Sequence, residues 1–142
     1  MKAHLSRRYH FSASHRLHTE AYDEARNMAV FGKCNNPHGH GHNYTVQVTL
    51  SGQVDPATGM VCNLAELDAF AQTNLLSRFD NTNLNTLDCF ANKVSTTENL
   101  SMEIYRIFQG FTAAHLERVR VEETSNNSFD YAGEATSAPG MI

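Results

Sequence analysis

The sequence predicts an α+β domain in which two helices cover one face of an antiparallel four-stranded sheet. Three observations predict it: apolar and polar side chains alternate in the first third of the chain, helical periodicity follows, and a second alternating pair of segments comes near the end. A length of 142 residues suits one domain. We expect that domain to span residues 1–133, and residues 134–142 to form a flexible tail with little to bury.

The first half of the chain supplies two strands. Residues 8–13 alternate in polarity, with Tyr9, Phe11 and Ala13 on the apolar face. Residues 42–52 alternate in the same way, and their apolar face carries Tyr44, Val46, Val48 and Leu50. The sequence DPATG at 55–59 predicts a turn, after which residues 60–62 are expected to pair back as a short strand.

Two helices and a hairpin are predicted next. Asn63 followed by Glu66 indicates an N-cap, and apolar residues at helical spacing follow it up to residue 75. The polar stretch 77–88 is expected to be an irregular connection. Residues 95–98 open the second helix, whose apolar stripe runs from Leu100 to Phe111 and which ends near Gly110. Residues 116–123 and 128–131 then predict a β-hairpin.

Composition excludes several classes of protein. A net charge of −4 and a pI near 6.0 argue against a nucleic-acid binder. No basic run indicates a membrane anchor, and no apolar stretch is long enough for a signal peptide or a membrane span. The three cysteines are an odd number without CxxC spacing, which argues against a disulfide scaffold and favours the reducing cytoplasm.

The histidines predict a metal site. His40 and His42 lie two residues apart, so on an extended strand both project from the apolar face of the 42–52 strand, and His15 continues the apolar face of the first strand. Three imidazoles leave a fourth tetrahedral position open on Zn²⁺, as in catalytic zinc sites; Ni²⁺ and Co²⁺ also suit nitrogen ligands. Because H-x-H is a weak signal, other third ligands stay open, namely His10, His18 and His38.

Five sequence blocks then carry a family resemblance. They are FSASHRL at 11–17, FGKCNNP at 31–37, GHGHNY at 39–44, DPATGMV at 55–61 and STTEN at 95–99. In their order and spacing they resemble the 6-pyruvoyl-tetrahydropterin synthase family, and the likeness extends from about Phe11 to Gly133. It implies a tunnelling (T-) fold and a homohexamer, a dimer of trimers with active sites between subunits. It also implies Zn²⁺ on His15, His40 and His42.

The resemblance further implies a carbon–oxygen lyase of tetrahydrobiopterin biosynthesis. Its pterin substrate would be 7,8-dihydroneopterin triphosphate, converted to 6-pyruvoyl-tetrahydropterin with loss of triphosphate. Cys34 matches the family's catalytic cysteine, whereas Cys62 and Cys89 are interpreted as structural. The substrate-binding positions that match are Thr96, Thr97, Glu98 and the pterin-binding carboxylate Glu123. Parity supports Glu123 independently, because it extends the apolar face of Val119 and Val121.

Two departures leave alternatives open. Asp80 matches the acid of the family's Asp–His relay, but Asn81 stands where the family has histidine, and an amide cannot accept and return a proton near pH 7. With this departure the resemblance implies one of three outcomes: a slow or redirected synthase, a synthase that relays protons through water, or a pterin-binding homologue with impaired catalysis. Counting from Cys34 to His38 also gives the spacing of the 6-carboxy-tetrahydropterin synthases, which cleave the side chain; Asn43 and Tyr44 favour the first register.

Overall fold

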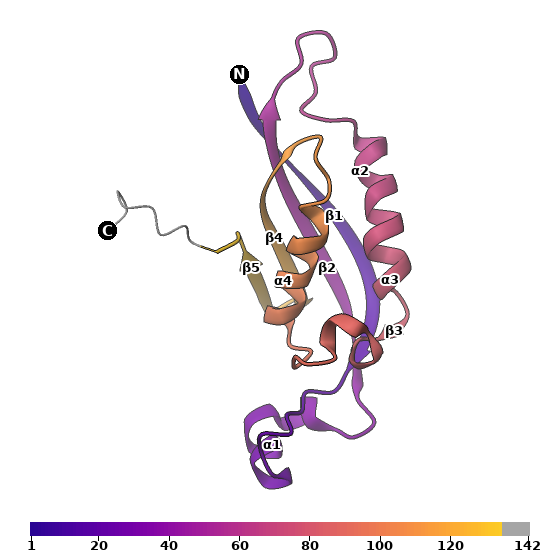
Figure 1. Ribbon diagram of the computed structural model, residues 1–142, viewed down its shortest axis with the longest axis vertical. Helices are drawn as coiled ribbons and strands as arrows, with labels where there is room; N and C mark the ends of the chain where they lie inside the picture. The colour runs from indigo at the N-terminus through magenta and orange to yellow at the C-terminus, as the bar shows by residue number, and fades with distance from the viewer. Residues whose placement is uncertain (135–142) are drawn as a thin grey trace, which may run out of the picture.

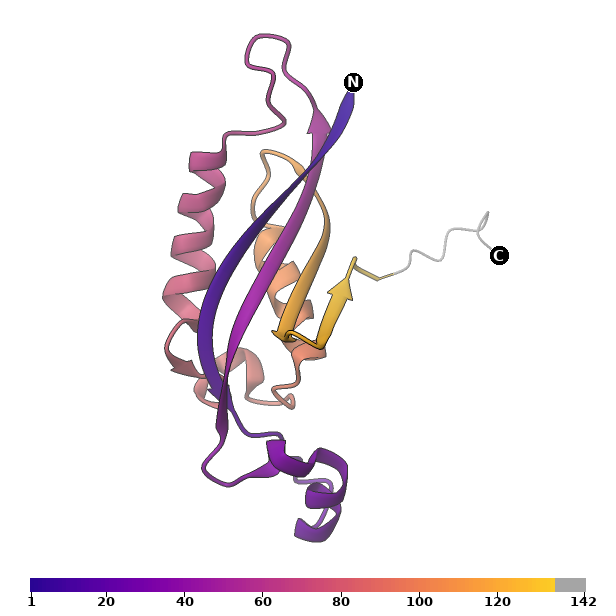
Figure 2. The ribbon, with the colours of Figure 1, turned by 180° about the vertical axis from the view of Figure 1, so that it is seen from behind.

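The structure is a computed structural model that describes residues 1–134. Its centre is a five-stranded sheet in the order β3-β1-β2-β4-β5. The helices α2 and α4 pack on one face of the sheet, and no described helix covers the opposite face (Figures 1 and 2). The α+β class and the one-sided helical layer are therefore confirmed. The main strands are β1 (Lys2–His15), β2 (His40–Gln53), β4 (His115–Thr124) and β5 (Asn127–Tyr131).

The pairing of β1 with β2 forms the backbone of the sheet. It is antiparallel and unbroken from Lys2 opposite Gln53 to His15 opposite His40. Side chains alternate as predicted: the apolar face of both strands is buried against the helices, while the intervening side chains of β1 are largely exposed. Both strands are longer than predicted, because the polar residues at their ends keep the register although they bury less apolar surface.

The helical layer consists of two rods. The first is continuous from residue 64 to 79 and comprises α2 (Leu64–Ala71), a π-helical turn (Gln72–Leu76) and α3 (Ser77–Phe79); Asn63 caps it by accepting from the Ala65 N–H at 2.8 Å. The second is α4 (Thr97–Phe108), capped by Thr96. The predicted stripes are buried except at Leu64, which is 37 % exposed, and each fully buried leucine contributes about 1.5–3 kcal/mol. They include Leu67, Ala71, Leu75, Leu100, Ile104 and Phe108.

The prediction of four antiparallel strands was wrong. The sheet has a fifth strand, β3 (Thr82–Asn83), which pairs parallel to β1 at Ala13 and Ser14, so the sheet is mixed. The segment preceding it is held to β1 by two hydrogen bonds: the Ser12 N–H donates to the Asp80 carboxylate at 3.0 Å, and the Asn81 N–H donates to the Ser12 carbonyl at 2.6 Å. A two-residue polar strand has no periodicity that a sequence can reveal.

The predicted strand at 60–62 is also absent among the described residues. Two backbone hydrogen bonds close the turn there: the Asp55 N–H donates to the Met60 carbonyl at 3.0 Å, and the Gly59 N–H donates to the Asp55 carbonyl at 2.7 Å. The reason is that β2 already has β1 on one edge and β4 on the other, so this segment has little free edge to pair with.

An unpredicted arm joins β1 to β2. It contains α1 (Glu24–Phe31) and the 3₁₀ turn η1 (Gly32–Asn35), and it projects from the lower end of the sheet (Figure 1). Asn27 is its buried anchor, because its amide donates to three carbonyls of the preceding loop. Further 3₁₀ turns lie at Leu84–Thr86 and Asp88–Phe90. No described helix is long and apolar enough to span a membrane. Of the predicted tail, residues 135–142 lie outside the described residues.

Glu103 ties the two helical rods together. Its buried carboxylate contacts Arg78 of α3 at 3.2 Å and Arg106 of α4. Burial acts to raise the pKa of Glu103, but the two guanidinium groups outweigh it and the pKa lies below its ordinary value. Because this pKa is lowered on folding, the stabilisation is complete above the ordinary glutamate pKa and is lost as the pH falls through the folded value.

We therefore expect Glu103→Gln to lower the free energy of unfolding at pH 7 by about 1–2 kcal/mol, between the ranges for exposed ion pairs and for hydrogen bonds to charged groups. Urea denaturation at pH 7 and again near pH 3 measures it, and the difference from wild type should shrink at the lower pH. Glu20→Gln, whose side chain is 98 % exposed, is the control. A difference that grows on acidification would contradict this account.

Candidate metal and catalytic site

Three imidazoles meet beside the arm, where β1 ends at His15 and β2 begins at His40. The register places His15 opposite His40 and Ala13 opposite His42, so all three histidines lie on the helix-covered face. Ring centroids of His15 lie 5.1 Å from both other rings, and those of His40 and His42 lie 4.6 Å apart, with interplanar angles of 82–89°. The Nε2 atoms of His40 and His42 are 2.9 Å apart. The predicted convergence of these three side chains is therefore what the fold produces.

His15 presents a nitrogen lone pair to this meeting point. Its Nδ1–H donates to the Ser95 carbonyl at 2.8 Å, so in the neutral ring Nε2 is the acceptor. Burial lowers the pKa of His15, which favours that neutral form. Its Nε2 is buried and has no hydrogen-bond partner among the described residues, which costs about 1–3 kcal/mol. A metal ion at this point would satisfy Nε2, so the residues present fit a cation.

A thiol and a carboxylate complete the donor set. Cys34 Sγ lies 3.6 Å from His40 Nε2, and Glu123 Oε1 lies 3.4 Å from His42 Nε2. One ligand atom from each of His15, Cys34 and His40 lies within 4.8 Å of the others, and the same holds for His15, His42 and Glu123. Neutral imidazoles with an adjacent thiol or carboxylate are typical ligands of Zn²⁺ and of neighbouring transition metals.

The alternative histidines lie elsewhere. His10 is on the exposed face of β1, where its Nδ1 contacts the Thr45 hydroxyl at 3.1 Å. His18 contacts Glu20 at 3.3 Å, and His38 is exposed in the loop before β2. The histidine pair that approaches His15 is consequently His40 and His42, which begins six residues after Cys34, and not His38 and His40, which begins four residues after it.

Cys34 lies in η1, half-buried at the edge of a cavity of about 840 Å³. Burial, and secondarily the Glu123 carboxylate, raises the pKa of its thiol. A thiolate there therefore needs a nearby cation. The volume lies within the range of small-molecule sites, and the lining combines the arm with the two β2 histidines: Met28, Gly32, Lys33, Cys34, Asn36, Pro37, His40 and His42. Cys62 and Cys89 instead pack against the core.

A residue in the first turn of α4 holds the Glu123 side chain in place. The buried Thr97 hydroxyl donates to the Glu123 carboxylate, which holds that carboxylate toward His42. Thr96 uses its own hydroxyl as the helix cap, accepting from the Asn99 N–H at 3.2 Å, and the Glu98 side chain is exposed. Of the three predicted residues in this block, Thr97 is thus the one that contacts Glu123. The role of Ser95 was missed, because a backbone carbonyl leaves no signal in a sequence.

Comparison with known proteins identifies the family of the chain. The sequence model described as 6-pyruvoyl tetrahydropterin synthase matches residues 4–134. The chain belongs to the 6-pyruvoyl tetrahydropterin synthase family. It is 47% identical to human 6-pyruvoyl tetrahydrobiopterin synthase over 135 residues, covering 94% of this chain and 93% of the human one. The Drosophila melanogaster protein of the same name is 46% identical, with 92% and 80% covered.

A solved structure of the same family agrees with the fold. The Caenorhabditis elegans 6-pyruvoyl tetrahydropterin synthase superposes with a TM-score of 0.89 at 39% identity, covering 94% of this chain and 97% of that one. The family resemblance read from the sequence blocks is therefore confirmed, and with it the assignment of the chain to an enzyme family.

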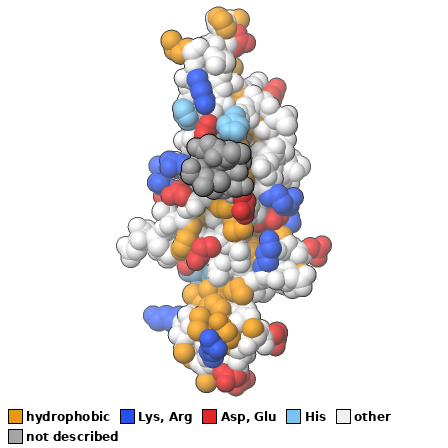
Figure 3. All heavy atoms as spheres, turned by 60° about the vertical axis from the view of Figure 1, so that its left-hand side comes forward, with side chains coloured by type: hydrophobic (Ala, Val, Ile, Leu, Met, Phe, Trp, Pro, Cys, Tyr) orange, Lys and Arg blue, Asp and Glu red, His pale blue; other side chains and the backbone are white. Residues whose placement is uncertain are grey.

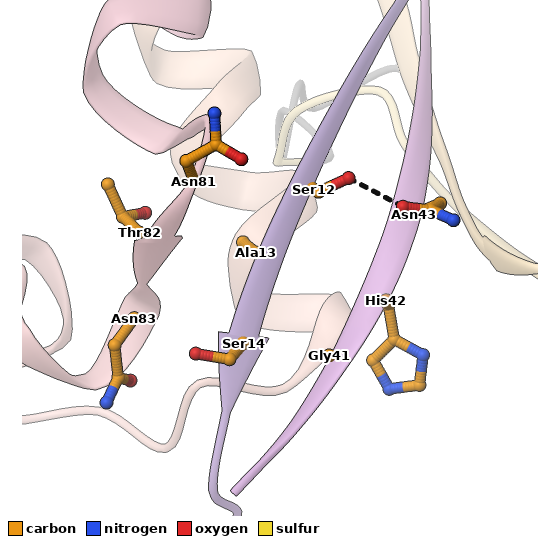
Figure 4. Close-up of a pocket in the computed structure, with 9 residues that line it drawn as sticks. All are labelled: Ser12, Ala13, Ser14, Gly41, His42, Asn43, Asn81, Thr82 and Asn83. Atoms are coloured by element: carbon orange, nitrogen blue, oxygen red, sulfur yellow. Dashed lines mark hydrogen bonds between the residues drawn. The ribbon is translucent and has the colours of Figure 1, made fainter.

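Two residues of this family member stand apart from the histidines. Asp80 and Asn81 follow α3 and bind Ser12 at the edge of β1. Asn81 has a left-handed backbone, φ 57°, and lines a second cavity of about 430 Å³ together with Ser12, Ser14 and Asn43. Figure 4 shows Asn81 beside the outer edge of β1 and His42 on β2, and both residues line this second cavity. Within one chain, the structure does not bring Asp80 and Asn81 to Cys34.

We expect Zn²⁺ at one hundred times its dissociation constant to raise the free energy of unfolding by about 2.7 kcal/mol, because it binds the folded site and satisfies His15 Nε2. Thermal or urea unfolding of metal-depleted protein, with and without zinc, measures it. His10→Ala should keep this stabilisation, and His15→Ala should lose the part of it that comes from this site at the same zinc concentration. Equal stabilisation of both variants would place the ion elsewhere.

Proposed function

We propose that this chain is a zinc-dependent 6-pyruvoyl-tetrahydropterin synthase that converts 7,8-dihydroneopterin triphosphate to 6-pyruvoyl-tetrahydropterin with loss of triphosphate. Family membership supports the reaction, as does the size of the cavity beside Cys34. The observation that carries the zinc dependence is the buried, unpartnered Nε2 of His15, which faces His40 and His42 beside a thiol.

In this proposal His15, His40 and His42 hold the zinc, and Ser95 fixes the ring of His15 through its carbonyl. When bound, zinc would supply Lewis-acid polarisation of hydroxyl oxygens in the substrate side chain, which would acidify the adjacent carbon atoms. Three protein ligands leave room for those oxygens, whereas a purely structural zinc site would be closed by a fourth.

Cys34 is the residue we assign to proton transfer. It lies beside His40 and lines the same cavity as His40 and His42, within reach of a substrate side chain placed over the histidines. The pKa of its thiol is raised in the metal-free chain, so a cation at the histidines is what would make it a thiolate. Loss of triphosphate and the internal redox tautomerisation then need no external electron acceptor.

Glu123 is the residue we assign to the pterin ring. The aminopyrimidine edge of a pterin offers two N–H donors, which match the two oxygens of a carboxylate. The Thr97 hydroxyl orients that carboxylate. The Glu123 side chain is only 16 % exposed, so its charge is costly unless it is paired. Thr96 and Glu98 would act through the same helix terminus, Thr96 by capping it.

A second copy of the chain would complete the site. Asp80 and Asn81 bind Ser12 at the outer edge of β1, and β3 pairs there only with Ala13 and Ser14. Among the described residues, the part of this edge that precedes Ser12 pairs with no strand, which leaves it open to a neighbouring chain. The arm exposes Met28 and Val30, at 59 % and 55 %, and hydrophobic side chains gather over it (Figure 3). These features support a homohexamer, a dimer of trimers with the tunnelling fold, in which Asp80 and Asn81 face a neighbour's Cys34.

The remaining assignments are also proposals. Residues 1–133 form one synthase domain, which agrees with the matched range 4–134. The described cysteines are all free, in keeping with a reducing cytoplasm. Side-chain cleavage to 6-carboxy-tetrahydropterin is the less favoured alternative, because His38 is exposed and belongs to neither group of potential metal ligands around His15. Mass spectrometry of the product distinguishes the two reactions.

Replacement of the proposed base should stop turnover. We expect Cys34→Ala to lower kcat by about 10²–10⁴-fold, the usual contribution of a positioned acid or base, while zinc content stays at the wild-type level. Release of triphosphate from 7,8-dihydroneopterin triphosphate measures it. Cys62→Ala, a thiol packed against the core, is the matched control and should remain close to wild type. Turnover of Cys34→Ala within about twofold of wild type would refute the assigned role.

The relay position offers a gain-of-function test. We expect Asn81→His to raise kcat by about tenfold or more, because an imidazole exchanges protons near pH 7 and an amide does not. Histidine tolerates the left-handed backbone found here, so the variant should fold. Asn81→Ala is the control without a proton-accepting group. If the histidine variant is slower than wild type, Asn81 is an adapted residue and the impaired-homologue reading is wrong.

A further inference from the structure

A second group of metal-ligating side chains lies at the other end of the sheet. The register places His4 of β1 opposite Ser51 of β2, and Ser51 opposite His115 of β4, so the three side chains stand in a row on the face without helices. This row is about 35 Å from His15 along β1. Figure 3 shows histidine side chains gathered there beside acidic and basic ones.

A β-bulge brings a carboxylate into this row. The pairing of β2 with β4 passes from Leu50 opposite Leu116 to Thr49 opposite Arg118, which leaves Glu117 as the extra residue. A bulge of this kind re-aims a side chain. The fully buried Ser51 hydroxyl donates to Glu117 Oε1 at 2.6 Å and so fixes the carboxylate over the middle of the row.

The carboxylate lies between the two imidazoles. His4 Nε2 and His115 Nε2 are each 3.9 Å from Glu117 Oε1. Ligand atoms around a tetrahedral Zn²⁺ are about 3.3 Å apart, so both rings must turn inward. Their side chains are 59 % and 74 % exposed, which leaves them free to rotate. The Ser51 hydrogen bond, with Lys2 and the histidines, holds the pKa of Glu117 below its ordinary value, so the ligand is ionised at neutral pH.

We propose that His4, His115 and Glu117 form a second Zn²⁺ site, with Ser51 as the outer hydrogen-bond partner that orients the glutamate. Two imidazoles and one carboxylate are a recurrent three-ligand set for this ion. An ion bound here would link β1 to β4 across β2 and stabilise this end of the sheet. The site is independent of the synthase reaction, because it shares no residue with the first one.

Lys2 competes with the ion for the same carboxylate. Its Nζ lies 3.7 Å from Glu117 Oε1, so zinc has to displace an ammonium group. Removing that group should strengthen the second site and leave the first unchanged. Removing the Ser51 hydroxyl should weaken the second site by about 10–100-fold, as for other orienting partners of metal ligands.

Zinc binding to the metal-depleted full chain tests the proposal, by equilibrium dialysis and isothermal titration calorimetry at pH 7.5. We expect two ions per chain. His115→Ala and His4→Ala should each weaken the second ion by more than about 100-fold, Lys2→Ala should tighten it several-fold, and His10→Ala, an exposed histidine on the same face of β1, should change nothing.

His15→Ala separates this proposal from the proposed function. It should remove the first ion and retain the second, with zinc-dependent shifts of the His4 and His115 ring resonances in NMR spectra. A wild-type chain that binds one ion, or a second ion unaffected by His4→Ala and His115→Ala, would overturn the second site. If the wild-type chain binds an ion at His4, His115 and Glu117 but none at His15, His40 and His42, the result contradicts only the proposed synthase site.

Discussion

The unbroken register between β1 and β2 is the constraint on which the rest of the structure depends. Because side chains alternate along a strand, a slip of one residue would turn every apolar residue of β1 outward and would separate His15 from His40. The same alternation serves two purposes. Along most of its length the inner face binds the helices through residues such as Phe11 and Tyr44, whose rings stack at 5.2 Å. At its end that face carries imidazoles, so the core and the site are held by one ladder of hydrogen bonds.

The helical layer supplies the other half of the site. Packing of Leu100 and Ile104 against the sheet sets the position of α4, and the position of α4 in turn places the Ser95 carbonyl on His15 and the Thr97 hydroxyl on Glu123. Apolar packing of α4 therefore determines where the Ser95 carbonyl and the Thr97 hydroxyl lie, although neither polar group is part of the apolar stripe. This arrangement leaves the buried Nε2 of His15 without a hydrogen-bond partner among the described residues, which is unfavourable in the absence of a ligand. A cation bound at this point would remove that penalty.

The two faces of the sheet carry different chemistry at opposite ends. At the arm end the inner face gathers histidines beside a thiol, whereas at the opposite end the outer face gathers His4, His115 and Glu117 around Ser51. Regular pairing explains the first group, and a one-residue bulge explains the second. Asn81 belongs to neither group, because its backbone binds Ser12 at the edge of the sheet.

The sequence by itself determined the family, the alternation of the long strands, both helical stripes and the parity of His15, His40, His42 and Glu123, because these follow from local periodicity and from motifs whose spacing is fixed along the chain. Only the tertiary structure decided the fifth, parallel strand, the α1 arm, the Ser95 contact, the meeting of His15 with His40 and His42, and the contact of Asp80 with Ser12. Each of these depends on which remote segments meet, or on backbone groups and bulges that side-chain identity does not encode.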